Sequence, residues 1–105
     1  MSECAAAQAR RDSLRLEAVR FERAAFEAYD PMEVSLALVS KAEVLREAGL
    51  PEQAEEALGR VRMYALDDAQ RRDVLVLKAL CAYDRADYEA ALVALNQAGG
   101  GSVVQ

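Results

Sequence analysis

A stretch of this chain occurs twice, 37 residues apart, and this internal repeat constrains the fold more than any other feature of the sequence. When the chain is shifted by 37, residues 38–61 lie over residues 75–98, and eight positions are identical. The identical pairs are Leu38/Leu75, Val39/Val76, Lys41/Lys78, Ala42/Ala79, Glu52/Glu89, Ala54/Ala91, Ala57/Ala94 and Leu58/Leu95. Self-similarity at such a period is typical of folds that stack one small supersecondary unit on the next.

Both copies carry the start and stop signals of helices. Asp30-Pro31 and Asp67-Asp68 are typical of helix starts, and Gly49 followed by Pro51 marks a turn between two helices. No segment alternates polar and apolar residues for long enough to predict a strand. We therefore expect an all-α fold of about five helices, near residues 3–29, 31–48, 51–65, 68–84 and 86–98. The short connections make successive helices antiparallel hairpins.

The repeat also divides the chain. Residues 1–30 fit it poorly and are expected to form an N-terminal flanking helix, which Asp12-Ser13 could interrupt. Residues 31–66 and 67–98 are expected to form the two repeats, and residues 99–105 are expected to form a disordered Gly-rich tail. One face of the flanking helix is apolar, and Val19 with Phe26 forms a second face, so contacts from two sides are expected. The first face comprises Leu14, Ala18, Phe21, Ala25 and Ala28.

Over about residues 35–98, the two copies resemble the tetratricopeptide repeat (TPR). This family has a small residue in the first helix, Gly or Ala at the turn, and Ala-x-x-x-large-x-x-Ala in the second helix. The matching residues are Ala42, Gly49, Ala54, Leu58 and Val61 in one copy and Ala79, Ala86, Ala91, Leu95 and Ala98 in the other. The period exceeds the family's value of about 34, which places extra residues near Tyr64–Asp67. The resemblance implies a TPR-like α-solenoid, and the copies also look similar to repeat segments of bacterial cell-envelope proteins.

In this family, ligands lie in a groove lined by the first helix of each hairpin. The resemblance assigns to that groove Val39, Glu43, Arg46, Val76, Leu80 and Tyr83. A protein or peptide partner with an apolar segment is therefore implied. Some members of the family bind the terminal carboxylate of a partner with several Lys, Arg and Asn side chains in this groove. Only Arg46 could serve that purpose here, so a carboxylate clamp is not expected. In the alternative interpretation, Val76, Leu80 and Tyr83 are core residues covered by the N-terminal helix.

The last helix is apolar on two sides, although a terminal repeat needs a polar or covered outer face. We expect self-association through Leu92 and Val93, as a homodimer or higher assembly; otherwise the natural polypeptide continues beyond Gln105. Lys41 and Lys78 occupy matching positions. Packing of their stems is favoured over a binding role, with the ammonium groups reaching acids such as Glu43 or Asp84.

The composition argues against catalysis and metal binding. The chain has no His, so the commonest general base and metal ligand is missing, and no enzyme activity, metal or cofactor is expected. The net charge of −5, with no basic stripe, argues against nucleic acid. Cys81 lies in an apolar segment and is expected in the core, whereas Cys4 is expected to be exposed. No apolar stretch approaches the roughly 20 residues of a membrane span, so no membrane insertion is expected.

Three functions remain open. The first is a non-enzymatic interaction module, or scaffold, that binds an apolar segment of a partner protein. The second is a structural self-association domain with no groove ligand, and the third is a small chaperone for a secreted client. A complete chain with no signal peptide would be cytoplasmic; a piece of a longer protein could belong to the cell envelope.

Overall fold

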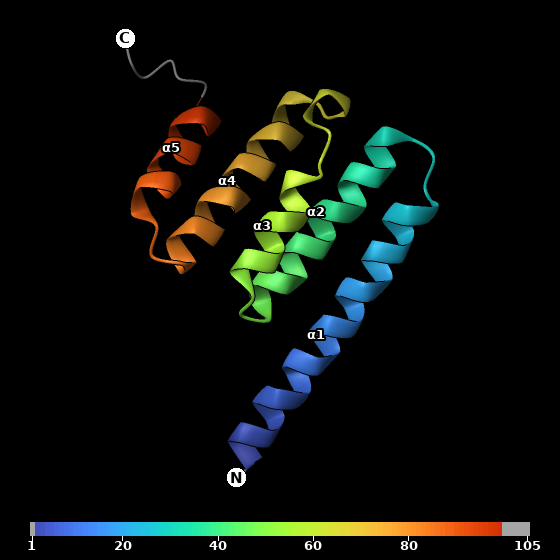
Figure 1. Cartoon of the computed structure of the whole chain (residues 1–105), viewed down its shortest axis with the longest axis vertical. Helices are drawn as coiled ribbons and strands as arrows, with labels where there is room; N and C mark the ends of the chain where they lie inside the picture. Colours follow the sequence, from blue (N-terminus) through green and yellow to red (C-terminus); the bar gives the residue numbers. More distant parts are fainter. Residues whose placement is uncertain (1, 100–105) are drawn as a thin grey trace.

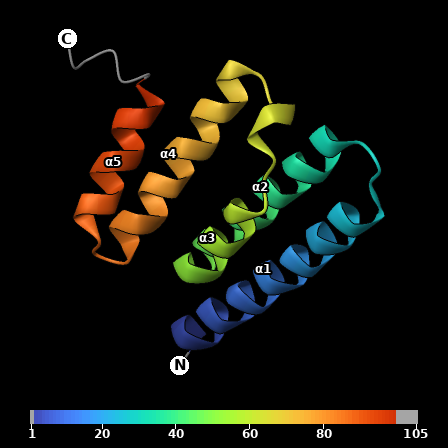
Figure 2. The ribbon, with the colours of Figure 1, turned by 45° about the horizontal axis from the view of Figure 1, so that its top comes forward.

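The computed structural model describes residues 2–99, with side chains from Cys4 onward, and this part of the chain is all-helical (Figure 1). The elements are α1 (Ser2–Glu27), α2 (Pro31–Glu47), α3 (Pro51–Gly59), the 3-10 turn η1 (Met63–Ala65), α4 (Asp68–Asp84) and α5 (Tyr88–Ala98). Successive helices run antiparallel and lie side by side in chain order (Figure 2). The all-α prediction is confirmed. The predicted tail lies outside the described residues apart from Gly99, which caps α5.

The 37-residue period is present in the backbone geometry as well as in the sequence. Helices α2 and α4 have 17 residues each, and both begin and end 37 residues apart. The turn after α2 is closed by the Leu50 N–H donating to Leu45 O at 2.9 Å, and the turn after α4 by Asp87 N–H donating to Ala82 O at 2.9 Å. Gly49 has φ +83° and Ala86 has φ +64°. Each turn thus places its matching residue in the left-handed region, which satisfies the last helical carbonyls.

Aspartates begin both long helices of the repeats. At α4, Asp67 Oδ1 accepts from the Gln70 N–H at 2.8 Å and Gln70 Oε1 accepts from the Asp67 N–H at 2.9 Å, which is a complete capping box. At α2, Asp30 Oδ1 accepts from the Met32 N–H at 3.0 Å. These caps fix where both helices start, as their sequence signals predict.

The third helix is shorter than predicted. It ends at Gly59, and the chain then passes through η1 instead of remaining helical to residue 65. A side chain that the sequence analysis did not single out stabilises this passage: Ser35 is fully buried and its Oγ accepts from the Arg62 N–H at 2.9 Å. Arg71 of α4 also holds this connection, since its Nε donates to Met63 O at 2.9 Å. The extra residues of the repeat are therefore used in a connection that is hydrogen-bonded to α2 and α4.

Helix α1 is continuous through Asp12-Ser13, so the possible interruption there is wrong. It packs antiparallel against α2, and its N-terminal part projects beyond the rest of the molecule (Figure 1). Its predicted apolar face is inward, since Leu14, Ala18 and Ala25 are buried. The predicted second face is open within the described structure, where Phe26 is 86% exposed. The fifth helix begins at Tyr88, two residues later than predicted.

The core lies where the helices approach closely. Ala42, Ala54 and Ala57 are fully buried, and such small side chains let neighbouring backbones come together. Leu38, Leu58 and Val74 fill the space around them. Cys81 is also fully buried, as predicted, and burial raises the pKa of its thiol to about 11. That thiol is therefore not a nucleophile at neutral pH, whereas Cys4 is exposed.

Candidate partner-binding surfaces

Helix α4 presents an apolar stripe to solvent. Val76, Leu80 and Tyr83 are 36%, 39% and 63% exposed, and spacings of four and three residues place them on one face of the helix. The alternative in which the N-terminal helix covers these residues is wrong. The reason is that α1 packs against α2, on the other side of α2 from α4 (Figure 1).

The stripe continues onto α5 through an aromatic pair. The rings of Tyr83 and Tyr88 meet edge to face, with centroids 5.3 Å apart and planes at 63°. Tyr88 is itself 61% exposed. Edge-to-face pairing favours a fixed ring orientation, so the two tyrosines form a rigid apolar end to the stripe. Helical spacing within α4 does not predict this contact, because Tyr88 lies on the next helix.

The α2 residues assigned to the same groove differ in exposure and in their contacts. Val39 is partly buried against the core, and Glu43 is exposed. Arg46 donates from Nε to Asp84 Oδ2 at 2.7 Å and so connects the C-terminal ends of α2 and α4. Leu36 and Met32, which the resemblance does not assign to the groove, are 36% and 39% exposed on α2. Leu36 precedes Glu43 by seven residues, so helical periodicity alone could have added it to this face.

The last helix is the least covered element of the second repeat. Leu92 is 60%, Val93 is 55% and Leu95 is 50% exposed, although Ala91 and Ala94 on the same helix are buried. The two predicted self-association residues therefore lie at the surface. Leu95, which matches the repeat pattern, belongs to the same exposed surface.

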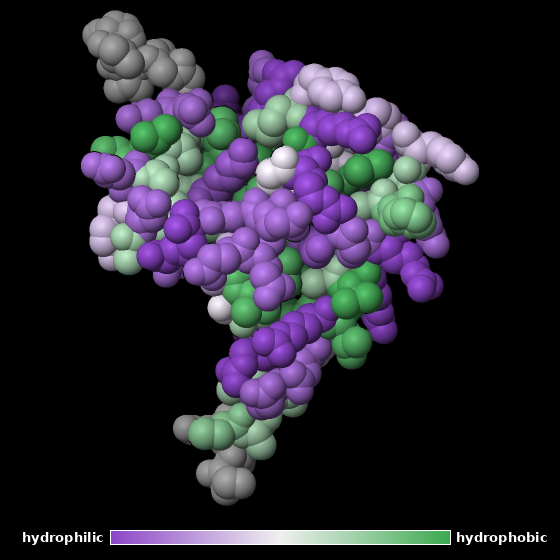
Figure 3. Space-filling view, viewed as in Figure 1, coloured by the Kyte–Doolittle hydropathy of each residue, from purple (hydrophilic) through white to green (hydrophobic). Residues whose placement is uncertain are grey.

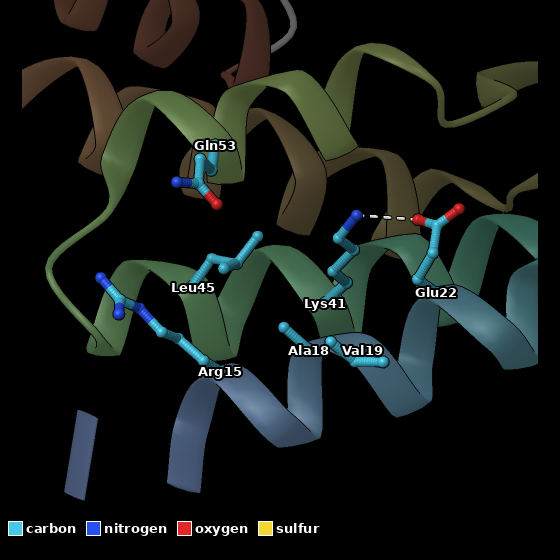
Figure 4. A pocket seen from close by; sticks show the side chains of 7 residues that line it. All are labelled: Arg15, Ala18, Val19, Glu22, Lys41, Leu45 and Gln53. Carbon is cyan, nitrogen blue, oxygen red and sulfur yellow. Dashed lines mark hydrogen bonds and ion pairs between the residues drawn. The ribbon is translucent and has the colours of Figure 1, made fainter. Parts of the chain in front are cut away.

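Two hollows lie on the side of the molecule formed by α1, α3 and α5. The first, of about 330 Å³, lies between α1 and α3 above α2, where apolar side chains gather in the space-filling view (Figure 3). Its lining residues are Arg15, Ala18, Val19, Glu22, Lys41, Leu45 and Gln53 (Figure 4). We call it the Lys41 cavity.

A charge cluster closes one end of the Lys41 cavity. The Lys41 ammonium lies 2.7 Å from Glu22 Oε1, as the dashed line in Figure 4 shows, and the Arg60 guanidinium donates to both Glu22 oxygens at 2.9 Å. Hydrogen bonds from Arg60 and Lys41 lower the pKa of the Glu22 carboxyl to about 2. Water or acids such as Glu43 and Asp84 were expected around the ammonium groups of Lys41 and Lys78, but Lys41 pairs with Glu22, and Asp84 pairs with Arg46. The partner of Lys41 comes from α1, outside the two repeats.

The second hollow, of about 430 Å³, lies between α3 and α5 above α4, and we call it the Lys78 cavity. It is lined by Glu55, Gly59, Lys78, Ala82, Ala90, Val93, Ala94 and Gln97. Five of these residues lie 37 positions after a residue of the Lys41 cavity: Glu55, Gly59, Lys78, Ala82 and Ala90 follow Ala18, Glu22, Lys41, Leu45 and Gln53. The two cavities are therefore the same feature of the repeat, formed twice.

Other kinds of site find no support in the described residues. Between residues 2 and 99, no helix is long and apolar enough to cross a bilayer, and no group of three or more His, Cys, Asp or Glu side chains could hold a metal ion. Comparison of the chain with protein-family models, curated proteins and solved structures returns no match. The TPR resemblance therefore rests on the residue pattern of this chain alone.

Proposed function

We propose that this protein is a TPR-like, non-enzymatic interaction module that binds an apolar segment of a partner protein along α4. The observation that carries the proposal is the stripe of Val76, Leu80 and Tyr83, which is extended by Tyr88. Exposed aliphatic residues that lie in a row at helical spacing, next to a paired aromatic, are what an apolar partner segment buries.

The charges at the end of this surface support a defined orientation of the partner. The Arg46–Asp84 ion pair lies where α2 and α4 end, and Glu43 is exposed on the adjacent turn of α2. Polar groups at the rim of an apolar patch contribute more to orientation and specificity than to affinity. In this proposal the stripe supplies the binding energy, and the rim charges select the direction in which the segment binds.

The experiment compares the same substitution at two exposed leucines, one in the stripe and one outside it. Leu80→Glu places a charge in the middle of the stripe, whereas Leu16→Glu places one on α1, where Leu16 is 63% exposed. Proteins captured from native lysate by wild type, Leu80→Glu and Leu16→Glu are quantified by mass spectrometry, after circular dichroism has shown that both variants fold. We expect a captured protein that Leu80→Glu loses and Leu16→Glu retains. Capture that is equal for all three forms would overturn the proposal.

Self-association is a second candidate because Leu92, Val93 and Leu95 are all at least half exposed on α5. If a second copy covers this helix, sedimentation velocity shows an assembly that Val93→Asp dissociates and Leu80→Glu leaves intact. A wild-type protein that sediments as a monomer at high concentration would exclude this function and leave the interaction module.

A further inference from the structure

The Lys41 and Lys78 cavities differ at one position, which determines whether the lysine has a carboxylate partner within the protein. In the Lys41 cavity, Glu22 holds the ammonium at 2.7 Å. The equivalent position in the Lys78 cavity is Gly59, which has no side chain. Both cavities therefore contain a lysine, but only the Lys41 cavity contains a carboxylate, that of Glu22, at this position.

There is room for a carboxylate at Gly59. A Cβ atom built on this residue would meet no atom of another part of the chain within 4 Å, and Gly59 lines the open hollow together with Lys78. Lys78 is partly buried beside this space, and within residues 4–99 no ion pair is formed by its ammonium. The carboxylate that lines the cavity, Glu55, is already bound by Arg85, whose Nε lies 2.8 Å from Glu55 Oε1.

The walls of the Lys78 cavity are apolar on the α5 side, where Ala90, Val93 and Ala94 line it. A carboxylate that binds the Lys78 ammonium would gain the charge-assisted hydrogen bond that Glu22 makes with Lys41. A ligand that combines a carboxylate with an adjacent apolar group therefore matches both parts of the cavity. The whole chain has a net charge of −5, so an acidic ligand is expected to bind only where a specific contact such as that with Lys78 offsets the repulsion.

We propose that the Lys78 cavity is a second binding site, which accepts an acidic side chain of a partner protein together with a neighbouring apolar side chain. The partner's Asp or Glu carboxylate takes the position that Glu22 occupies in the Lys41 cavity. The apolar neighbour lies against Val93 and Ala94. This site lies on the side of the molecule formed by α1, α3 and α5, so it does not depend on the α4 stripe.

The test uses two blocked peptides as probes, acetyl-Ala-Leu-Glu-Ala-Leu-amide and its Gln counterpart. Binding is followed by amide chemical shifts of Gly59, Lys78 and Val93 in ¹⁵N-labelled protein. The Glu peptide is expected to bind roughly tenfold more tightly than the Gln peptide. Lys78→Met is expected to abolish this preference, whereas Lys78→Arg retains it.

A matched pair at Gly59 tests the same site from within the protein. Gly59→Glu supplies the missing carboxylate and should weaken binding of the Glu peptide more than the isosteric Gly59→Gln, which fills the same space without the charge. Gly59→Glu should also raise the melting temperature relative to Gly59→Gln, and this difference should vanish when Lys78→Met is added. Equal binding of the two peptides, or equal behaviour of the two Gly59 variants, would overturn the proposal.

Discussion

The two repeats have the same helix starts and the same turn bonds, yet they bury their matching leucines very differently. Leu58 on α3 is 1% exposed, whereas Leu95, 37 residues later on α5, is 50% exposed. The backbone does not account for this difference. Both turns close with a 2.9 Å hydrogen bond between equivalent positions, Leu50 to Leu45 and Asp87 to Ala82. What differs is the next element: α4 packs against α3, and no described helix follows α5. The burial of a side chain in either repeat thus depends on whether another helix packs against its own helix, as well as on the residue itself.

The largest expected effect comes from truncating this pair of leucines. Leu58→Ala leaves a cavity in the core and should lower the free energy of unfolding by about 2–5 kcal/mol. Leu95→Ala removes a half-exposed side chain and should lower it by less than about 1 kcal/mol. Urea denaturation of both variants measures the two values.

Protein concentration makes this comparison sharper. If a second copy covers α5 in solution, the effect of Leu95→Ala should grow with concentration, because assembly stabilises the folded state by mass action. Values for Leu58→Ala and Leu95→Ala that are equal at every concentration would contradict the difference in burial between the repeats.

Local signals in the sequence were sufficient to predict most of the fold. Asp67 with Gln70, and Gly49 before Pro51, act through hydrogen bonds within a few residues, so they are visible in the sequence. The end of α3 was not predicted, because apolar spacing continues through Val61 and Ala65 after the helix has stopped at Gly59. That connection is held by the distant Ser35, which no local pattern indicates.

The second expected effect compares the two turns. Gly49 and Ala86 both have positive φ, but only Ala86 carries a Cβ atom, which is disfavoured there by roughly 1–2 kcal/mol. Gly49→Ala should therefore lower the free energy of unfolding by about 1 kcal/mol. No atom lies within 4 Å of the added Cβ, so the loss is conformational.

Ala86→Gly is the opposite change at the matching position. It should raise the free energy of unfolding, by less than about 1 kcal/mol, because glycine also gives more freedom to the unfolded chain. Thermal denaturation of the two variants, and of the double variant, measures both effects. A stabilising Gly49→Ala would show that the turn after α2 does not have the left-handed geometry in solution.

The candidate surfaces were less predictable than the fold. The stripe of Val76, Leu80 and Tyr83 could be named from helical periodicity, but its exposure depends on where α1 packs, which the sequence does not specify. The partner of Lys41 was missed for the same reason. Glu22 lies in the flanking helix, outside the two aligned copies, and only the tertiary packing of α1 brings it to 2.7 Å from the lysine.

The smallest expected effect concerns the charge cluster that the Lys41 cavity has and the Lys78 cavity lacks. Hydrogen bonds from Arg60 and Lys41 lower the pKa of Glu22 from its usual 4.5 to about 2. A carboxyl whose pKa is lower in the folded state stabilises the protein above its unfolded value, and this stabilisation is lost as the pH falls through the folded value. The Glu22 side chain is 38% exposed, so solvent screening holds the effect near that of a surface ion pair, about 0.5–1 kcal/mol.

Glu22→Gln should therefore lower the free energy of unfolding at neutral pH, and the difference from wild type should shrink as the pH falls from about 4.5 to about 2. Glu56→Gln is the matched control, because its carboxylate is 64% exposed and lies 3.8 Å from the same Arg60 guanidinium. Urea denaturation of the three proteins at several pH values gives the comparison. A Glu22→Gln effect that stayed constant down to pH 2 would show that the lost stability comes from packing of the side chain in the Lys41 cavity and not from its charge.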